Sequence, residues 1–287
     1  MRAKCLRTLV ICAALIATYH GAAYCDDEEQ QLGWKNELVT SLNLTQAAFD
    51  NWSQGGENVL AWQTNLLGRF TRHGERSEWR TGIKLEYGMT KTGDDDPRKT
   101  VDEIKIETVY NYKLRFAVDF YVAGAAETQF AKGYEYFDSS REVISDFLDP
   151  GCFTESAGIS KSYGEALRSR FGFAAKQTIA DNFARRYTDD PETSEKVEDV
   201  RSEVGVESVT DLNLKLNENL VFASNLDLFS NLDATNEIDV VWDNVLTAKV
   251  APYVNVNLTI KLVYDRDIST KRQLKQSLAL GLTYAIL

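Results

Sequence analysis

The sequence predicts an all-β protein, a transmembrane, antiparallel, up-and-down β-barrel of about 12 strands. Three observations lead to this fold class. Apolar and polar side chains alternate with period two along many segments. The connections between these segments are alternately short and long, as they are in outer-membrane barrels. Aromatic residues gather toward the segment ends, where such barrels meet the membrane interface.

The start of the chain has the order of residues found in a secretory signal peptide. Arg2, Lys4 and Arg7 give it a positive start, an apolar run covers 9–17, and the small residues 21–23 precede an acidic segment. The apolar run is too short to cross a bilayer as a helix. We therefore divide the chain into a signal peptide (1–25), a short acidic N-terminal segment (26–33) and an outer-membrane β-barrel (34–287).

Cysteine content and charge narrow the class of protein further. Cleavage after Ala23 and after Cys25 fits equally well, and the bulky Tyr24 disfavours a lipid anchor at Cys25. Only Cys152 lies outside the signal segment, so no internal disulfide is expected. The formal net charge of −11 argues against nucleic acid as a partner, because phosphates require basic surface. No apolar stretch beyond the signal is long enough for a transmembrane helix, which leaves a soluble exported domain or a membrane barrel.

The clearest strand covers 253–265, where Leu258 belongs to an apolar face and Lys261 to the opposite, polar face. The same reasoning predicts strands at 34–48, 57–71, 76–91, 100–113, 115–131, 152–163, 166–183, 196–215, 219–232, 237–251, 253–266 and 272–286. All four prolines fall between these ranges, as full strand pairing requires. An even strand number brings both termini to one side, the periplasmic side. The alternative is a soluble sandwich or lipocalin-like barrel, but strands of 13 or more residues exceed the usual soluble length.

One stretch, FDNWSQGGENVLAW (49–62), does not have the pattern of an ordinary strand or loop. With the signal peptide and the closing strand, it resembles an uncharacterised family of outer-membrane barrels of Bacteroidetes type, a domain of unknown function. That family carries an Asn-Trp-x-x-Gly-Gly-x-Asn signature after the first strand, which Asn51, Trp52, Gly55, Gly56 and Asn58 match. The resemblance implies the fold and an outer-membrane location, but no activity. The stretch is either a structural turn or a ligand-binding loop.

The inward faces of the predicted strands carry charges of both signs. These residues are Arg80, Lys84, Glu86, Glu103, Lys105, Glu107, Arg170, Lys176, Arg201, Glu203, Glu207, Asp211, Asp227, Asp243, Lys249 and Lys261. If the 92–99 loop is centred between 95 and 96, Lys84 stands opposite Glu107 and Glu86 opposite Lys105. A pore that selects one ion type needs one dominant sign of charge. The mixed lining therefore predicts a largely occluded lumen crossed by salt bridges.

The inventory of reactive side chains does not favour an enzyme. His20 belongs to the signal segment and His73 to a predicted periplasmic turn, so histidine-dependent catalysis and a His/Cys metal site are not expected. The acidic loops 93–97 and 189–192 match no calcium-binding spacing and are expected to be solvated. No cofactor is expected.

The sequence therefore predicts a structural outer-membrane barrel or a narrow, largely occluded pore. The alternative is a specific small-solute uptake channel or a surface ligand-binding barrel. The expected partners are outer-membrane lipid and lipopolysaccharide, the barrel-assembly machinery and, in the alternative, a small solute.

Overall fold

The computed structural model describes residues 32–50, 53, 55–114, 116–137, 140–188, 197–233, 238–266 and 271–287. The predicted signal peptide, most of the acidic segment, Asn51 and Trp52 lie outside the described residues, as does the 189–192 loop.

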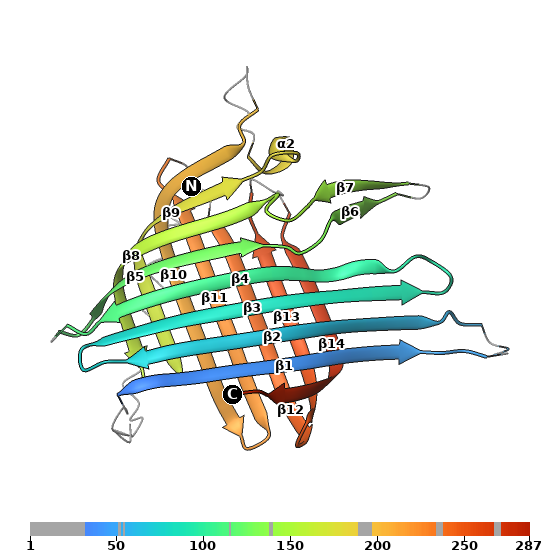
Figure 1. Cartoon of the computed structure of the whole chain (residues 1–287), viewed down its shortest axis with the longest axis horizontal. Helices are drawn as coiled ribbons and strands as arrows, with labels where there is room; N and C mark the ends of the chain where they lie inside the picture. Colours follow the sequence, from blue (N-terminus) through green and yellow to red (C-terminus); the bar gives the residue numbers. More distant parts are fainter. Residues whose placement is uncertain are drawn as a thin grey trace, which may run out of the picture. The chain divides into compact units, whose positions relative to one another are not determined.

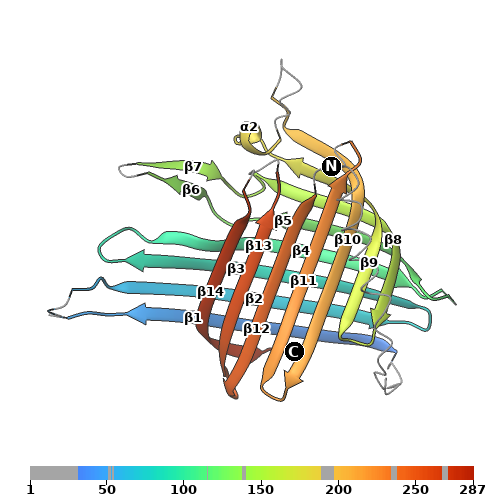
Figure 2. The same ribbon diagram turned by 180° about the vertical axis from the view of Figure 1, so that it is seen from behind.

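Twelve antiparallel strands close into a barrel, in which each strand pairs with the next along the chain and β1 pairs with β14 (Figures 1 and 2). The strands are β1 (Gly33–Ala47), β2 (Val59–His73), β3 (Ser77–Thr92), β4 (Arg98–Tyr112), β5 (Asp119–Thr128), β8 (Gly151–Tyr163), β9 (Leu167–Ile179), β10 (Val200–Asn217), β11 (Leu220–Asn231), β12 (Asp239–Ala251), β13 (Val254–Tyr264) and β14 (Gln273–Ala285). The predicted fold class and strand number are confirmed.

Three further elements occupy long connections that the sequence analysis treated as plain loops. Strands β6 (Gly133–Tyr136) and β7 (Arg141–Ser145) form a separate two-stranded sheet between β5 and β8, and the one-turn helix α2 (Ala184–Tyr187) follows β9. Asp149 anchors the segment before this helix, since its carboxylate accepts hydrogen bonds from the backbone N–H groups of Asp181 and Asn182 at 3.0 and 2.9 Å. Among the described residues, no helix is long and apolar enough to cross a membrane.

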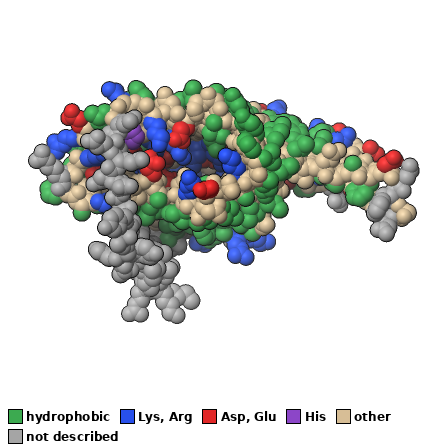
Figure 3. All heavy atoms as spheres, turned by 90° about the horizontal axis from the view of Figure 1, so that it is seen from below, with side chains coloured by type: hydrophobic (Ala, Val, Ile, Leu, Met, Phe, Trp, Pro, Cys, Tyr) green, Lys and Arg blue, Asp and Glu red, His purple; other side chains and the backbone are tan. Residues whose placement is uncertain are grey.

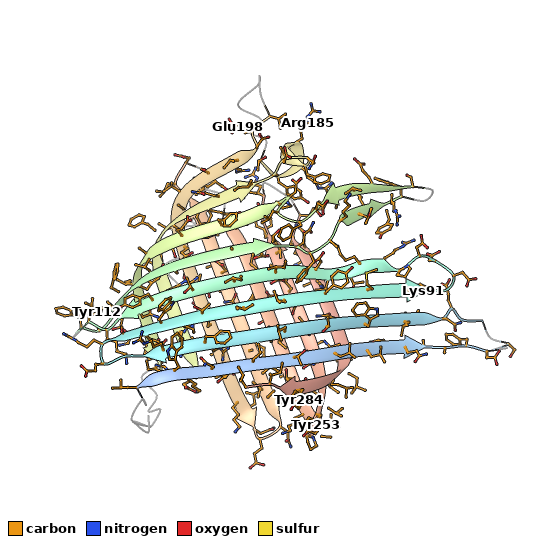
Figure 4. The ribbon with its side chains drawn as sticks, in the orientation of Figure 1. Lys91, Tyr112, Arg185, Glu198, Tyr253 and Tyr284 are labelled. Atoms are coloured by element: carbon orange, nitrogen blue, oxygen red, sulfur yellow. The ribbon has the colours of Figure 1, made fainter. Side chains whose placement is uncertain are left out.

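The two rims of the barrel differ, as the lengths of the connections predicted. One rim, here called the short-turn end, carries the short connections together with the start of β1 and the end of β14. The other, the long-loop end, carries the β6–β7 sheet and α2. Figure 4 places Tyr112, Tyr253 and Tyr284 at the short-turn end and Lys91, Arg185 and Glu198 at the long-loop end. The rings of Tyr253 and Tyr284 stack with centroids 6.3 Å apart.

The apolar faces of the strands point outward. Phe173, Leu278 and Leu282 expose 69, 67 and 56% of their area. In the space-filling view, hydrophobic side chains surround the barrel while charged side chains of both signs gather in its hollow (Figure 3). A soluble protein would bury these apolar side chains in a core. The sandwich or lipocalin-like alternative, in which the apolar face fills the interior, is therefore wrong.

The barrel closes at a short seam between β1 and β14. Their pairing covers only Val39–Leu44 against Leu280–Ala285, whereas β1 pairs with β2 along its whole length. At the seam Gly281 lies beneath Asn43 and Asn257, whose side chains share a hydrogen bond of 3.4 Å. A Cβ atom at Gly281 would stand 2.5 Å from the Oδ1 atom of Asn43. The absence of a side chain at this position therefore lets the two asparagines meet across the seam.

Candidate functional site in the lumen

Period-two alternation places the predicted lumen residues on the inward faces of their strands. The β3–β4 pairing, however, differs from the expectation: Lys84 stands opposite Lys105, Glu86 opposite Glu103, and Glu107 opposite Gly82. The predicted Lys84–Glu107 and Glu86–Lys105 pairs are therefore wrong.

The cause of this difference is the turn after β3. The Asp95 N–H donates to the Thr92 carbonyl at 3.1 Å, so the chain reverses close to the end of β3, at Gly93, whose φ of +54° suits glycine. A β-bulge then shifts the register next to Gly88. Like charges now face each other directly, and the attractive contacts run diagonally. The Lys84 Nζ atom lies 3.1 Å from Glu103 and 3.5 Å from Glu86.

The lumen contains a buried cluster around Arg170 of β9. Its Nη2 atom lies 2.5 Å from the Glu107 carboxylate on β4, and its Nε atom donates to Glu207 on β10 at 3.2 Å. The same Glu207 oxygen accepts hydrogen bonds from the Tyr121 hydroxyl at 3.1 Å and from the Ser156 hydroxyl at 2.7 Å. Five strands thus share one hydrogen-bonded group, in which Tyr121 is fully buried and Glu207 is 4% exposed.

Further ion pairs join strands that are not neighbours in the barrel. Lys261 on β13 lies 3.3 Å from Glu103 on β4, and Arg80 on β3 lies 3.9 Å from Asp211 on β10. Lys176 on β9 also forms an ion pair with Asp239 on β12. Because these partners belong to separate parts of the wall, the contacts cross the lumen. We refer to these contacts, with the Arg170–Glu107 pair, as the lumen braces.

The Lys176 Nζ atom lies 3.0 Å from Asp239 and 3.6 Å from Asp265, so this brace reaches two carboxylates. Other predicted charges form contacts along the wall: Lys261 with Asp243 at 3.5 Å, Lys105 with Glu127 at 3.7 Å, and Arg201 with Glu203 at 3.3 Å.

Sequence reasoning missed several lumen residues, chiefly Arg168, Tyr121 and Ser156. Arg168 has the same strand parity as Arg170, so the alternation pattern alone could have included it. The roles of Tyr121 and Ser156 as donors to Glu207 carry no local signal.

A cavity of about 500 Å³ lies in the lumen. It is lined from β1, β2, β3, β4, β9, β10, β11 and β12, and it reaches the short-turn end at Glu165, in the turn between β8 and β9. Five basic side chains (Arg69, Arg80, Lys84, Lys105 and Arg168) and five acidic ones (Glu37, Glu107, Glu165, Asp211 and Asp243) contribute to its wall. This volume suits a small molecule.

The structure brings the described part of the signature stretch together with its neighbours in a turn. The Asn58 side chain accepts a hydrogen bond from the Phe49 N–H at 2.7 Å, and the Asn58 carbonyl accepts one from the Gly93 N–H at 2.7 Å. Gly55 and Gly56 have φ values of +79° and +154°, and a Cβ atom at Gly56 would stand 2.8 Å from the Phe49 ring. These contacts fit a structural role in shaping the β1–β2 connection.

Among the described residues, no three or more His, Cys, Asp or Glu side chains form a group that could hold a metal ion. His73 is the last residue of β2, at the short-turn end, and its Nδ1 atom lies 3.4 Å from Glu78. In the acidic 93–97 turn, Asp95 pairs with Arg98 at 3.1 Å.

Comparisons with known proteins give one family match and a set of similar solved structures. Residues 44–134, about a third of the chain, match the model of a family described as "Protein of unknown function (DUF3078)". A search of curated proteins found no match.

Similar solved structures include the translocator domain of the autotransporter NalP from Neisseria meningitidis, with 10% identity, a TM-score of 0.41, and coverage of 97% of this chain and 94% of that chain. An outer membrane channel from Pseudomonas putida F1 has 11% identity and a TM-score of 0.40, covering 92% and 99%. The NanC porin has 12% identity and a TM-score of 0.41, covering 88% and 100%.

Proposed function

We propose that this chain is an outer-membrane β-barrel protein whose lumen is largely occluded by its own side chains, so that it serves as a structural barrel or a narrow pore. The outward apolar face supports the membrane location, because a closed barrel pairs its backbone groups internally and can present apolar side chains to lipid. The aromatic rings at the short-turn end fit an interfacial girdle.

The lumen braces are the observation that carries the occlusion. Charges of opposite sign meet across the interior, at Arg170–Glu107 and Lys261–Glu103, instead of lining an open path. Eight strands leave room only for side chains and porins need about sixteen, so twelve strands give an intermediate lumen that long paired side chains can fill.

The orientation and the partners follow from the same proposal. The short-turn end, with both described ends of the barrel segment, faces the periplasm, and the long-loop end faces the exterior. Outer-membrane lipid and lipopolysaccharide surround the wall, and the barrel-assembly machinery inserts it. Nucleic acid is no partner for so acidic a chain, and no catalytic role is proposed.

Planar-bilayer conductance tests the occlusion. The wild-type protein is expected to show little steady current. The double variant Glu103→Gln with Lys261→Met removes one brace and should produce a measurable conductance. The matched control, Asp95→Asn with Arg98→Gln, removes an exposed pair in an outer turn and should stay silent. A large, steady and strongly ion-selective current in the wild type would refute the proposal.

A second candidate, a specific uptake channel for a small solute, is favoured by one observation, the cavity of about 500 Å³. In that case the braces would gate a path. Saturable block of a small current by one class of solute would distinguish this function from a structural barrel.

A further inference from the structure

We propose that the lumen binds a small organic oxyanion, through a carboxylate or phosphate group, between Arg80, Arg168 and Arg170. This inference goes beyond occlusion, since an anion can bind in a closed or a conducting barrel. A titration tests it, whereas conductance tests the proposed function.

The three arginines converge on one region of the lumen. Arg168 and Arg170 are alternate residues of β9, and Arg80 comes from β3. All three line a small cavity of about 20 Å³, and Arg80 and Arg168 also line the larger cavity beside it. Two walls of the barrel thus direct guanidinium groups toward the same space.

Each of these arginines retains a buried nitrogen that donates no hydrogen bond to any described residue. The atoms are Arg80 Nη1, Arg168 Nε and Arg170 Nη1. Arg170 is 9% exposed, and Arg80 Nη1 approaches Glu78 only to 3.6 Å, beyond hydrogen-bonding distance. Buried donors without a partner are costly, and three in one place indicate a site built for an acceptor.

The local charges single out Arg168. Glu107 and Glu207 neutralise Arg170. Arg168 forms no ion pair with the described residues and lies close enough to Arg80 for their charges to repel.

The carboxylate opposite Arg168 on the neighbouring strand already contacts other residues. Asp211 stands directly opposite Arg168 on β10, but its oxygens accept a hydrogen bond from Asn225 at 2.8 Å and face Arg80 at 3.9 Å. An anion seated between Arg80 and Arg168 would relieve their repulsion and supply the missing acceptors.

The chemistry of the lining defines the class of ligand. A guanidinium group binds a carboxylate or phosphate through paired hydrogen bonds. Hydroxyl and amide side chains beside the arginines can reach the remaining oxygens; these are Asn111, Ser160 and Ser162. In the larger cavity, Val39 and Leu67 add an apolar surface, and Leu67 is 48% exposed. The site therefore fits a small anion with an apolar body better than a bare inorganic ion.

Titration of the purified full chain in detergent, at constant ionic strength, tests the proposal. The probes are benzoate, succinate and inorganic phosphate, with glucose as a neutral control. We expect saturable binding of at least one anion and none of glucose. Arg168→Gln should weaken this binding about ten-fold or more. Arg72→Gln, at the same end but on the outward face, should leave it unchanged. Preference for phosphate over both carboxylates would assign a phosphate ligand, and the reverse order an organic acid.

The melting temperature of Arg168→Gln without added anion separates loss of the binding site from loss of the fold. Because Arg168→Gln removes a charge that repels Arg80, the melting temperature of the variant without anion should be no lower than that of the wild type. Added anion should raise the melting temperature of the wild type more than that of the variant. Absence of saturable binding, equal affinity in Arg168→Gln, or a variant that melts well below the wild type would overturn the proposal.

Discussion

Replacement of Arg170 by methionine should be among the most destabilising single changes in the lumen. The guanidinium contacts Glu107 at 2.5 Å and Glu207 at 3.2 Å, and its side chain is 10% exposed. Methionine keeps most of the side-chain volume but removes the cation that contacts both carboxylates. Removing one partner of a buried ion pair costs about 3–5 kcal/mol. We expect about 3 kcal/mol, because Glu207 keeps the hydrogen bonds from Tyr121 and Ser156.

Urea unfolding of the protein in lipid vesicles, followed by tryptophan fluorescence, measures this cost. Lys35→Met is the matched control: Lys35 also reaches a separate part of the barrel, at Glu165, but both side chains are more than half exposed. Solvent screening should hold its effect below about 0.5 kcal/mol. Adding Glu107→Gln and Glu207→Gln to Arg170→Met should recover much of the lost stability, since no buried charge is then unpaired. If the triple variant is as unstable as Arg170→Met, or if Arg170→Met costs no more than the control, the reasoning fails.

Three further predictions concern topology, the lipid face and the seam. A protease-cleavable tag near Asp95 should be cut on intact cells and one near Glu218 should not; the opposite result would invert the proposed orientation. Leu258→Arg, on the outward face, should cost roughly 2–4 kcal/mol and impair assembly in a heat-modifiability gel, whereas Lys261→Arg in the lumen should be mild, and equal tolerance would contradict the assigned faces. Gly281→Val should destabilise the barrel by about 1–3 kcal/mol, because its side chain would displace a β1 asparagine 2.5 Å from the new Cβ, and it should therefore lower the temperature of the heat-modifiability transition. An unchanged transition temperature would show that the seam adapts freely.

Sequence alone was sufficient for the strands and for the direction in which each side chain points. Period-two alternation is a local property, and it separated the outward face of Leu258 from the inward face of Lys261 before any pairing was known. Proline and turn residues then limited the strand number to twelve. The β6–β7 sheet and α2 escaped prediction because they are too short to show a periodic pattern.

Tertiary structure decided which charges meet. A register shift of two residues leaves every side chain on its own face, so alternation could not distinguish the predicted Lys84–Glu107 pair from the observed Lys84–Lys105 pair. The turn at Gly93 and the neighbouring bulge made that choice. Contacts such as Lys261–Glu103, 158 residues apart, depend on how twelve strands tilt and close, which is a property of the whole barrel. Among the described residues Arg168 forms no ion pair, and this has the same origin, because Asp211, which stands opposite it, contacts Asn225 and Arg80 instead.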